Sequence, residues 1–219
     1  MAIITISRGA FSEGKKLAEC LSEKLGYRSI SREILIQAAS AAGISEQKLL
    51  KAIEQPVSEK ERLGLDIDRL HYLSFIQAAL CEEAKDDNIV YHGFGGHVLL
   101  IGIPHLIKVK VIAAMELRAK LAMETLKFTR EEAVAYIVHM DDLRTKWTKF
   151  LYNVDWNEPS QYDKVIDFDK TTMTDACNGI VDMTKYPEFQ TTEASRKAMN
   201  DLLLISREKQ QLHQKMLQK

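Results

Sequence analysis

The sequence predicts an α/β domain in which helices cover both faces of a mostly parallel sheet. Short apolar segments alternate along the chain with longer segments whose apolar residues recur at helical spacing. Of the 219 residues, 46% are apolar, while glycine and proline number only 10 and 4, which excludes disordered and collagen-like chains. The length fits one domain with an appendage, or at most two small domains.

The first half of the chain carries three predicted strands, at 2–6, 27–30 and 88–91, of which 2–6 is a β-branched apolar run. Helical periodicity predicts helices at 13–25, 32–42, 45–55 and 66–85. Gly26 ends the first helix, Gly43 the second, and Ser45 caps the third. Pro56 follows the third helix, so 56–65 is predicted to be an exposed connection. The inward face of the fourth helix is predicted to carry Leu70, Leu73, Ile76, Leu80 and Ala84.

The second half continues the alternation. Strands are predicted at 107–114 and 162–168, and helices at 115–127, 129–140 and 175–183. Thr129 and Glu132 have the spacing of a capping box at the start of the 129–140 helix. The last segment, 191–219, is predicted to be an amphipathic helix that packs on the domain or on a partner helix. Its inward residues are predicted to be Ala198, Leu202, Ile205, Leu212 and Met216.

Charge and cysteine content narrow the function classes. The chain has 30 Lys and Arg against 31 Asp and Glu, whereas sequence-independent nucleic-acid binders carry a basic excess. Apolar runs of membrane-spanning length and a secretory leader are not found, so a cytoplasmic protein without nucleic-acid or membrane partners is expected. Cys20, Cys81 and Cys177 are widely spaced and odd in number, which favours buried free thiols over a disulfide framework or a zinc site.

The segment from Gly9 to Lys16 lies between the first strand and the first helix and has the G-x-x-x-x-G-K spacing of a phosphate-binding loop. In such a loop, backbone N–H groups and the positive end of the helix dipole hold a polyphosphate. The lysine, here Lys15, reaches the outer oxygens. Lys16 stands where Ser or Thr normally holds Mg²⁺. From these residues alone, an ordinary strand–turn–helix corner with solvated lysines is an equal alternative.

Several segments follow one another in the order of a known pattern. The first is ITISRGAFSEGKKLAECLSEKLGYRSISREIL, similar to ITISR-x-x-GSGG-R-x-IA-x-x-LA-x-x-LG-x-x-x-x-D-R-E-IL. The next is IVYHGFGGHVLL, similar to VIVGRGA-x-x-IL, and residues 129–167 are similar to a run of S-x-EEA, D-x-x-R and DW-x-x-P-x-x-YD. Together these segments resemble the cytidylate kinase-like family of P-loop kinases over about residues 3–185.

The resemblance implies a three-layer α/β/α P-loop NTPase fold with a five-stranded, mostly parallel sheet. A kinase-like domain would span 1–186 with a helical lid at about 128–157, and a helical extension would span 187–219. The implied reaction transfers the γ-phosphoryl group of ATP to CMP, dCMP or a related small acceptor, with Mg²⁺ held by water and phosphates. Implied catalytic residues are Lys15, Arg144 and Lys146. Implied donor-binding residues are Arg8, Gly9, Ser12, Glu13, Gly14, Lys15 and Lys16. Implied substrate-binding residues are Arg32, Gly93, Phe94, Gly95 and Asp141, the last also placed to orient Arg144.

This chain departs from the family pattern at charged and glycine positions. Phe11 and Glu13 replace loop glycines, Phe94 replaces an arginine, and Ser31 replaces the aspartate of D-R-E. A catalytically weakened nucleotide-binding sensor is therefore an alternative to a kinase. A third alternative is a structural protein that forms a homodimer through the C-terminal helix.

Other conspicuous side chains favour structural roles. The spacing of His92, His97 and His105 fits neither a helical nor a strand pair of metal ligands, so structural histidines are expected. Trp147 and Trp156 are expected to pack against the core rather than to stack on a base.

Overall fold

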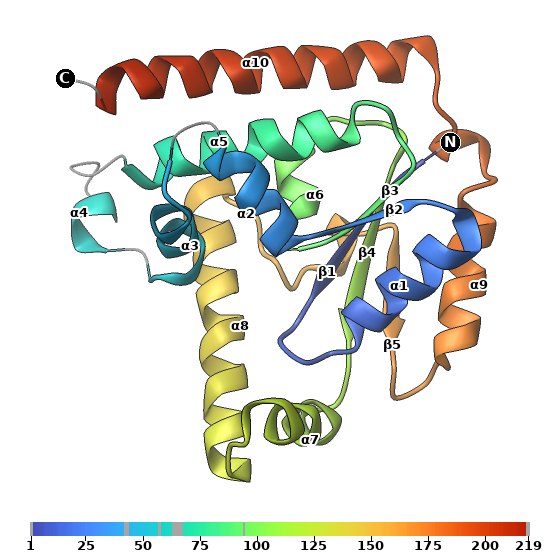
Figure 1. Ribbon diagram of the computed structural model, residues 1–219. Coiled ribbons are helices and arrows are strands. Elements are labelled where there is room, and N and C mark those ends of the chain that lie inside the picture. Colours follow the sequence, from blue (N-terminus) through green and yellow to red (C-terminus); the bar gives the residue numbers. More distant parts are fainter. Residues whose placement is uncertain (1, 42–43, 57, 63–67, 94, 218–219) are drawn as a thin grey trace.

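The computed structural model describes residues 2–41, 44–56, 58–62, 68–93 and 95–217. Its centre is a five-stranded, all-parallel sheet in the order β2-β3-β1-β4-β5 (Figure 1). The strands are β1 (Ile3–Arg8), β2 (Arg28–Ser31), β3 (Ile89–His92), β4 (Leu106–Ile112) and β5 (Lys164–Asp167). The predicted sheet is confirmed, and its parallel strands place all their carboxyl ends at one edge.

The helices follow the predicted order with two additions. They are α1 (Gly14–Leu25), α2 (Arg32–Ser40), α3 (Glu46–Glu54), α4 (Glu59–Arg62), α5 (Asp68–Ala84), α6 (Gly96–Leu99), α7 (Met115–Leu126), α8 (Arg130–Tyr152), α9 (Met173–Met183) and α10 (Glu193–Leu217), with 3₁₀ turns at Pro159–Gln161 and Pro187–Phe189. The additions are the short helices α4, within the predicted connection, and α6, after β3. Gly43, Leu65 and Phe94 lie outside the described residues.

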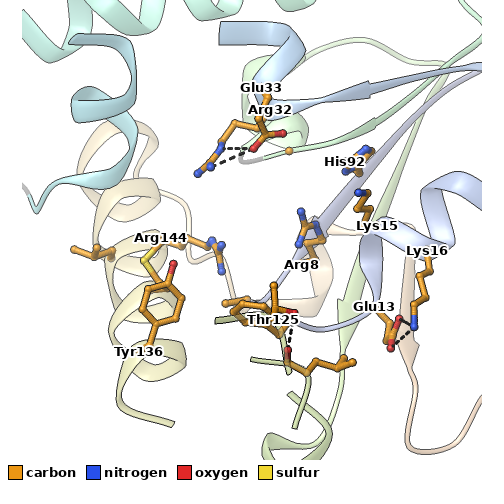
Figure 2. Close-up of a pocket in the computed structure, with 16 residues that line it drawn as sticks. Arg8, Glu13, Lys15, Lys16, Arg32, Glu33, His92, Thr125, Tyr136 and Arg144 are labelled. Carbon is orange, nitrogen blue, oxygen red and sulfur yellow. Dashed lines mark hydrogen bonds and ion pairs between the residues drawn. The ribbon is translucent and has the colours of Figure 1, made fainter. Parts of the chain in front are cut away.

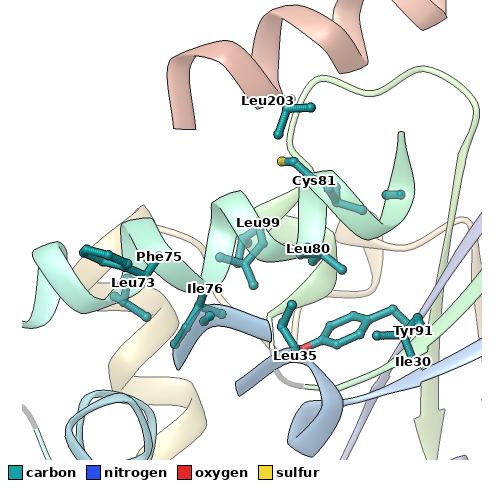
Figure 3. Packing of buried hydrophobic residues seen from close by; sticks show 14 of the residues in the cluster. Ile30, Leu35, Leu73, Phe75, Ile76, Leu80, Cys81, Tyr91, Leu99 and Leu203 are labelled. Atoms are coloured by element: carbon teal, nitrogen blue, oxygen red, sulfur yellow. The ribbon is translucent and has the colours of Figure 1, made fainter. Parts of the chain in front are cut away.

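The helices form two layers around the sheet, as Figure 1 shows. On one face, α1 and α9 bury residues such as Leu17, Leu21 and Ile180 against the sheet. On the other face, α2, α3, α5, α6 and the end of α8 share one core with α10. Figure 3 shows part of this second core, with Leu203 of α10 above Cys81 of α5. The three-layer α/β/α fold is thereby confirmed.

Two predicted caps are present. The Ser45 side chain accepts a hydrogen bond from the Lys48 N–H at the start of α3. Thr129 and Glu132 form both hydrogen bonds of a capping box at the start of α8. The α8 helix continues past the predicted end at residue 140 to Tyr152, because Trp147 enters the main core and stabilises the added turns.

The inward face of α10 differs from the prediction. Ser195, Met199, Leu203 and Ser206 are buried, whereas Ile205 is 46% exposed and Leu212 is 59% exposed. Ala198 and Leu202 are half-buried, and the side chain of Met216 lies outside the described residues. The prediction is confirmed for Ala198 and Leu202, which pack against the core, and wrong for Ile205 and Leu212. Part of the packed side is formed instead by serine, and Ser206 contacts the Cys81 thiol of α5.

The cysteine prediction is confirmed for Cys81, which is a buried free thiol, and wrong for the other two. Cys20 of α1 and Cys177 of α9 form a disulfide with a Cα–Cα distance of 6.4 Å. The two helices lie side by side on the same sheet face. Their proximity cannot be predicted from the sequence, because the two cysteines are 157 positions apart in the chain.

Within the described residues, none of the helices combines the length and apolar character needed to span a bilayer.

Candidate active site

A cavity of about 490 Å³ opens at the carboxyl ends of β1, β3 and β2. Arg8 ends β1, His92 ends β3, and Arg32 directly follows β2. Ligands of parallel α/β sheets bind at this edge. Figure 2 shows Arg144 of α8, Arg32 of α2 and Lys15 of α1 around this cavity. The lining contains five cationic side chains, Arg8, Lys15, Lys16, Arg32 and Arg144, and two carboxylates, Glu13 and Glu33.

The start of α1 lies in this region, because Glu13 and Lys15 line the cavity. The first N–H groups of any helix lack intrahelical acceptors. Glu13, the N-cap residue of α1, makes no side-chain capping bond. A Cβ atom at Gly14 would overlap the Arg8 side chain, so glycine is required for this close approach. A helix N-terminus beside arginines favours an anion.

The loop before α1 has a backbone that is unusual for its residues. Phe11 has φ 57° and Glu13 has φ 64°, both in the left-handed region that favours glycine. The Ser12 hydroxyl donates to the Gly9 carbonyl at 2.9 Å and closes the turn. Two loop positions therefore hold a backbone conformation that favours glycine although their residues carry side chains, at a cost of about 1–3 kcal/mol for each.

Two of the arginines are strongly affected by burial. Burial lowers the pKa of Arg8, with Glu33 opposing the shift and Arg32 adding to it. Burial also lowers the pKa of Arg144 to about 10, which Asp141 opposes. Among the described residues, Arg8 Nε is buried and has no hydrogen-bond partner. An unpartnered buried donor of this kind favours a bound anion.

The carboxylates of the lining are tied to neighbouring cations. Glu33 Oε1 lies 3.2 Å from Arg32 Nη2, and Glu13 Oε2 lies 3.0 Å from Lys16 Nζ. These pairs reduce the positive charge of the cavity but do not cancel it.

Comparison with known proteins agrees with this geometry. The sequence pattern of the Cytidylate kinase-like family matches residues 3–170. The chain belongs to this family.

A cytidylate kinase from Methanothrix thermoacetophila is 29% identical over 167 residues, which cover 75% of this chain and 87% of the relative. An uncharacterized protein from Eubacterium ventriosum has a similar structure, with TM-score 0.60, 19% identity and coverage of 83% of this chain and 97% of that one. A shikimate kinase from Bacteroides thetaiotaomicron has TM-score 0.51 and 10% identity, with coverage of 84% and 99%. The structural likenesses support the P-loop kinase fold, and the family is one of P-loop phosphotransferases.

The structure brings most of the predicted site residues together. Arg8, Glu13, Lys15, Lys16, Arg32, Gly93 and Arg144 line the cavity. Gly9, Ser12, Gly14, Gly95 and Asp141 belong to the loops and helices around it without lining it. Lys146 lies away from the cavity, 59% exposed and 2.7 Å from Asp142. Phe94 lies outside the described residues.

The predicted contact between Asp141 and Arg144 is present, with Asp141 Oδ1 2.9 Å from Arg144 Nη1. The same carboxylate contacts Arg118 of α7, which sequence reasoning missed. One feature of the sequence could have indicated Arg118. At helical spacing, Arg118 lies on the same face as Met115, Ala119 and Ala122, which pack with the loop residue Ala10.

The three histidines have different surroundings. His105 Nε2 lies 2.8 Å from Asp87 Oδ1, and His97 Nδ1 lies 2.9 Å from Ser7 Oγ, as expected for structural histidines. His92 lines the cavity. Burial lowers the pKa of its side chain, and the positive charges of Arg8 and Lys15 lower it further. In the part of the chain that the structure describes, groups of three His, Cys, Asp or Glu side chains suited to a metal ion are not found.

Glu13 provides a direct test of the loop. Replacing Glu13 with glycine is expected to raise the free energy of unfolding by about 1 kcal/mol, because glycine adopts positive φ without strain. It should also tighten ATP binding, because a carboxylate leaves the cavity. Chemical denaturation and isothermal titration calorimetry measure the two effects.

Two controls separate strain from charge in this experiment. Glu13→Gln removes the charge alone, and Glu19→Gln removes the exposed carboxylate that lies 3.8 Å from Lys15 on α1. Equal ATP affinity of wild type and Glu13→Gln would show that this carboxylate does not act on the phosphates.

Proposed function

We propose that this protein transfers the γ-phosphoryl group of ATP to CMP, dCMP or a related small acceptor. The observation that carries the proposal is the convergence of Arg8, Lys15, Arg32 and Arg144 on one cavity at the start of α1. Phosphoryl transfer needs mainly positive charge and fixed positions, and such a cavity supplies both. The family and its cytidylate kinase relative support the choice of acceptor.

The proposed roles follow from position. Lys15 and the first N–H groups of α1 bind the donor phosphates, and Arg8 contacts them from the end of β1. Arg32, on the neighbouring strand end, binds the acceptor phosphate. An acceptor oxygen attacks the γ-phosphorus, the bond to the β–γ bridging oxygen breaks, and ADP leaves. Arg144 stabilises the charge on the transferred group.

A bound magnesium ion would supply charge neutralisation on the donor phosphates. The loop provides few oxygen ligands for it, because the Ser12 hydroxyl is bonded to the Gly9 carbonyl and Lys16 occupies the position of the usual Ser or Thr. We therefore propose that phosphates and water hold the ion.

Glu13 favours a second candidate, a nucleotide-binding sensor with little transfer activity, because its carboxylate lines the cavity where phosphates would bind. A coupled assay of ADP release over all nucleoside and deoxynucleoside monophosphates, run beside thermal-shift titrations with ATP and Mg²⁺, distinguishes the two. Turnover on CMP or dCMP is expected. Stabilisation by ATP without turnover on any acceptor would contradict the kinase and support the sensor.

Lys15 provides the matched test of the loop. Lys15→Met should abolish the thermal shift with ATP, whereas Lys16→Met should reduce it less, because Lys16 is already tied to Glu13. An unchanged shift in Lys15→Met would contradict the phosphate-binding role of the loop. No response of the wild type to any nucleotide would contradict both candidates and leave the structural dimer.

A further inference from the structure

The peptide groups of the loop residue Ala10 are held by two side chains from the predicted lid region and its flank. Arg118 Nε donates to the Ala10 carbonyl at 2.8 Å, and the Ala10 N–H donates to Asp141 Oδ1 at 3.1 Å. Arg118 Nη2 and Asp141 Oδ2 are 2.5 Å apart, which closes a ring of three contacts. The guanidinium and carboxylate thus fix Ala10 through both its donor and its acceptor.

The neighbouring glycine is adapted to this arrangement. A Cβ atom at Gly9 would lie 2.8 Å from Arg118 Nη2 and 3.0 Å from Arg118 Cζ. Contacts shorter than ordinary packing distance would push the guanidinium away from Ala10. A side chain at position 9 would therefore require the Arg118 guanidinium to shift.

The loop needs external support because its own residues do not favour its shape. Phe11 follows Ala10 directly with φ 57°, and Glu13 has φ 64°. Strained backbone persists where the surrounding structure fixes it. Arg118 and Asp141 supply polar contacts of this kind, and Phe11 adds an apolar one by packing near Tyr136 of α8, with ring centroids 6.2 Å apart.

Asp141 links the loop to the cavity as well. Its Oδ1 atom accepts from both the Ala10 N–H and Arg144 Nη1, the latter at 2.9 Å. Its side chain is 25% exposed, and that of Arg118 is 11% exposed, so water competes weakly for these bonds. One carboxylate therefore sets the position of a loop peptide and of an arginine that lines the cavity.

We propose that Arg118 and Asp141 are positioning residues for phosphoryl transfer. Arg118 sets the shape of the phosphate-binding loop, and Asp141 sets both the loop and the direction of Arg144. This assignment rests on the proposed function. It predicts that Arg118 affects donor binding, whereas Asp141 affects donor binding and turnover.

Arg118→Lys tests the first part without removing the charge beside Asp141. A lysine has one nitrogen and cannot bond Ala10 and Asp141 with the separate nitrogens that arginine uses. The dissociation constant for ATP should rise about tenfold, the equivalent of one charge-assisted hydrogen bond, while kcat changes by less than about threefold. Hydrogen exchange of a peptide covering residues 9–16 should become faster.

Asp141→Asn tests the second part. Its amide keeps an acceptor for Ala10 but loses the charge that holds both guanidinium groups, so ATP binding should weaken and kcat should fall about a hundredfold through misplacement of Arg144. Asp142→Asn is the matched control, because Asp142 is 48% exposed and pairs with Lys146 away from the cavity. Equal effects of the two aspartate variants would overturn the assignment of Asp141.

Glu116→Gln is the matched control for Arg118→Lys. Glu116 and Arg130 form an exposed ion pair between the same two helices, α7 and α8, with 2.8 Å between Oε2 and Nη2. This control should leave ATP binding and loop exchange at wild-type values. Wild-type values in Arg118→Lys, or equal changes in both variants, would overturn the proposal. The hydrogen-exchange measurement needs no nucleotide. If the wild type fails to bind ATP, the proposed function is contradicted, but the exchange rates still test whether Arg118 holds Ala10.

Discussion

Replacing Arg144 with methionine is expected to lower kcat for phosphoryl transfer about a thousandfold, the smaller end of the effect of arginines that contact a transferred phosphoryl group. The dissociation constant for ATP should change by less than about tenfold, because Arg8 and Lys15 remain. Single-turnover kinetics and calorimetric titration with ATP measure the two quantities separately.

The surroundings of Arg144 explain the expected size of this effect. Its side chain is 18% exposed, and burial lowers its pKa to about 10, with Asp141 opposing the shift and Arg8, Arg32 and Arg118 adding to it. The guanidinium therefore stays charged at neutral pH. A charge that is desolvated and held by Asp141 acts on phosphates more strongly than a solvated one.

Lys146→Met is the control. Lys146 follows Arg144 by two residues, which places it about 200° around the helix. Its ammonium pairs with the exposed Asp142, so kcat should stay at the wild-type value. A loss of turnover in Lys146→Met equal to that in Arg144→Met would contradict the assignment of the charge-stabilising role to Arg144 alone.

This pair of residues illustrates how far sequence reasoning reaches. The loop from Gly9 to Lys16 and the position of Arg32 are local features, because each lies just after a predicted strand. Parallel strands then bring them to one edge without further information. Arg144 and Lys146 could not be separated in the same way, since the orientation of α8 depends on Trp147 entering a core formed by distant segments.

Contacts between distant elements account for what the sequence did not predict. Arg118 acts through Ala10 and Asp141, which are far from it in the chain, and Cys20 meets Cys177 only because α1 and α9 pack side by side. On α10, the buried face includes Ser195 and Ser206, and Ser206 contacts the Cys81 thiol of α5. Hydropathy alone ranks such residues as exposed.

A second large effect is expected at Lys110 of β4, which is 5% exposed. Wild-type stability should rise between pH 7 and pH 9 relative to Lys110→Met, by about 1.4 kcal/mol per pH unit at most and about 2 kcal/mol over the window. Urea unfolding followed at several pH values measures this difference. The slope with pH is the decisive quantity, since loss of a hydrogen bond alone would be independent of pH.

The direction follows from the pKa of the lysine. Burial lowers it to about 7, with Asp141 and Asp155 opposing the shift and Arg144 and Arg118 adding to it. Above pH 7 the folded protein releases this proton, whereas the unfolded chain keeps it until about pH 10.4. The unfolded state then binds more protons, so stability rises with pH through this window. Below pH 7 both states are protonated, and the cost of burying the charge is fully present.

Two titratable side chains near Lys110 do not change their charge in the folded protein between pH 7 and pH 9. Burial lowers the pKa of His97 to about 4, and burial raises the pKa of Tyr162 above its ordinary value, so neither titrates between pH 7 and pH 9. Lys108→Met is the matched control, because Lys108 is on the same strand, 34% exposed and 3.6 Å from Asp163.

The position of Lys110 connects this titration to the site. Lys110 Nζ donates to the Trp156 carbonyl at 3.0 Å and lies 2.7 Å from the centroid of the Trp156 ring, whose face favours the charged form. Trp156 follows α8, the helix that carries Asp141 and Arg144, so Lys110 fixes the carboxyl-terminal end of that segment against the sheet. If the free energy of unfolding of Lys110→Met varied with pH as that of the wild type does, the lowered pKa of Lys110 would be contradicted. Lys110 would then release its proton at the same pH in the folded and unfolded chains.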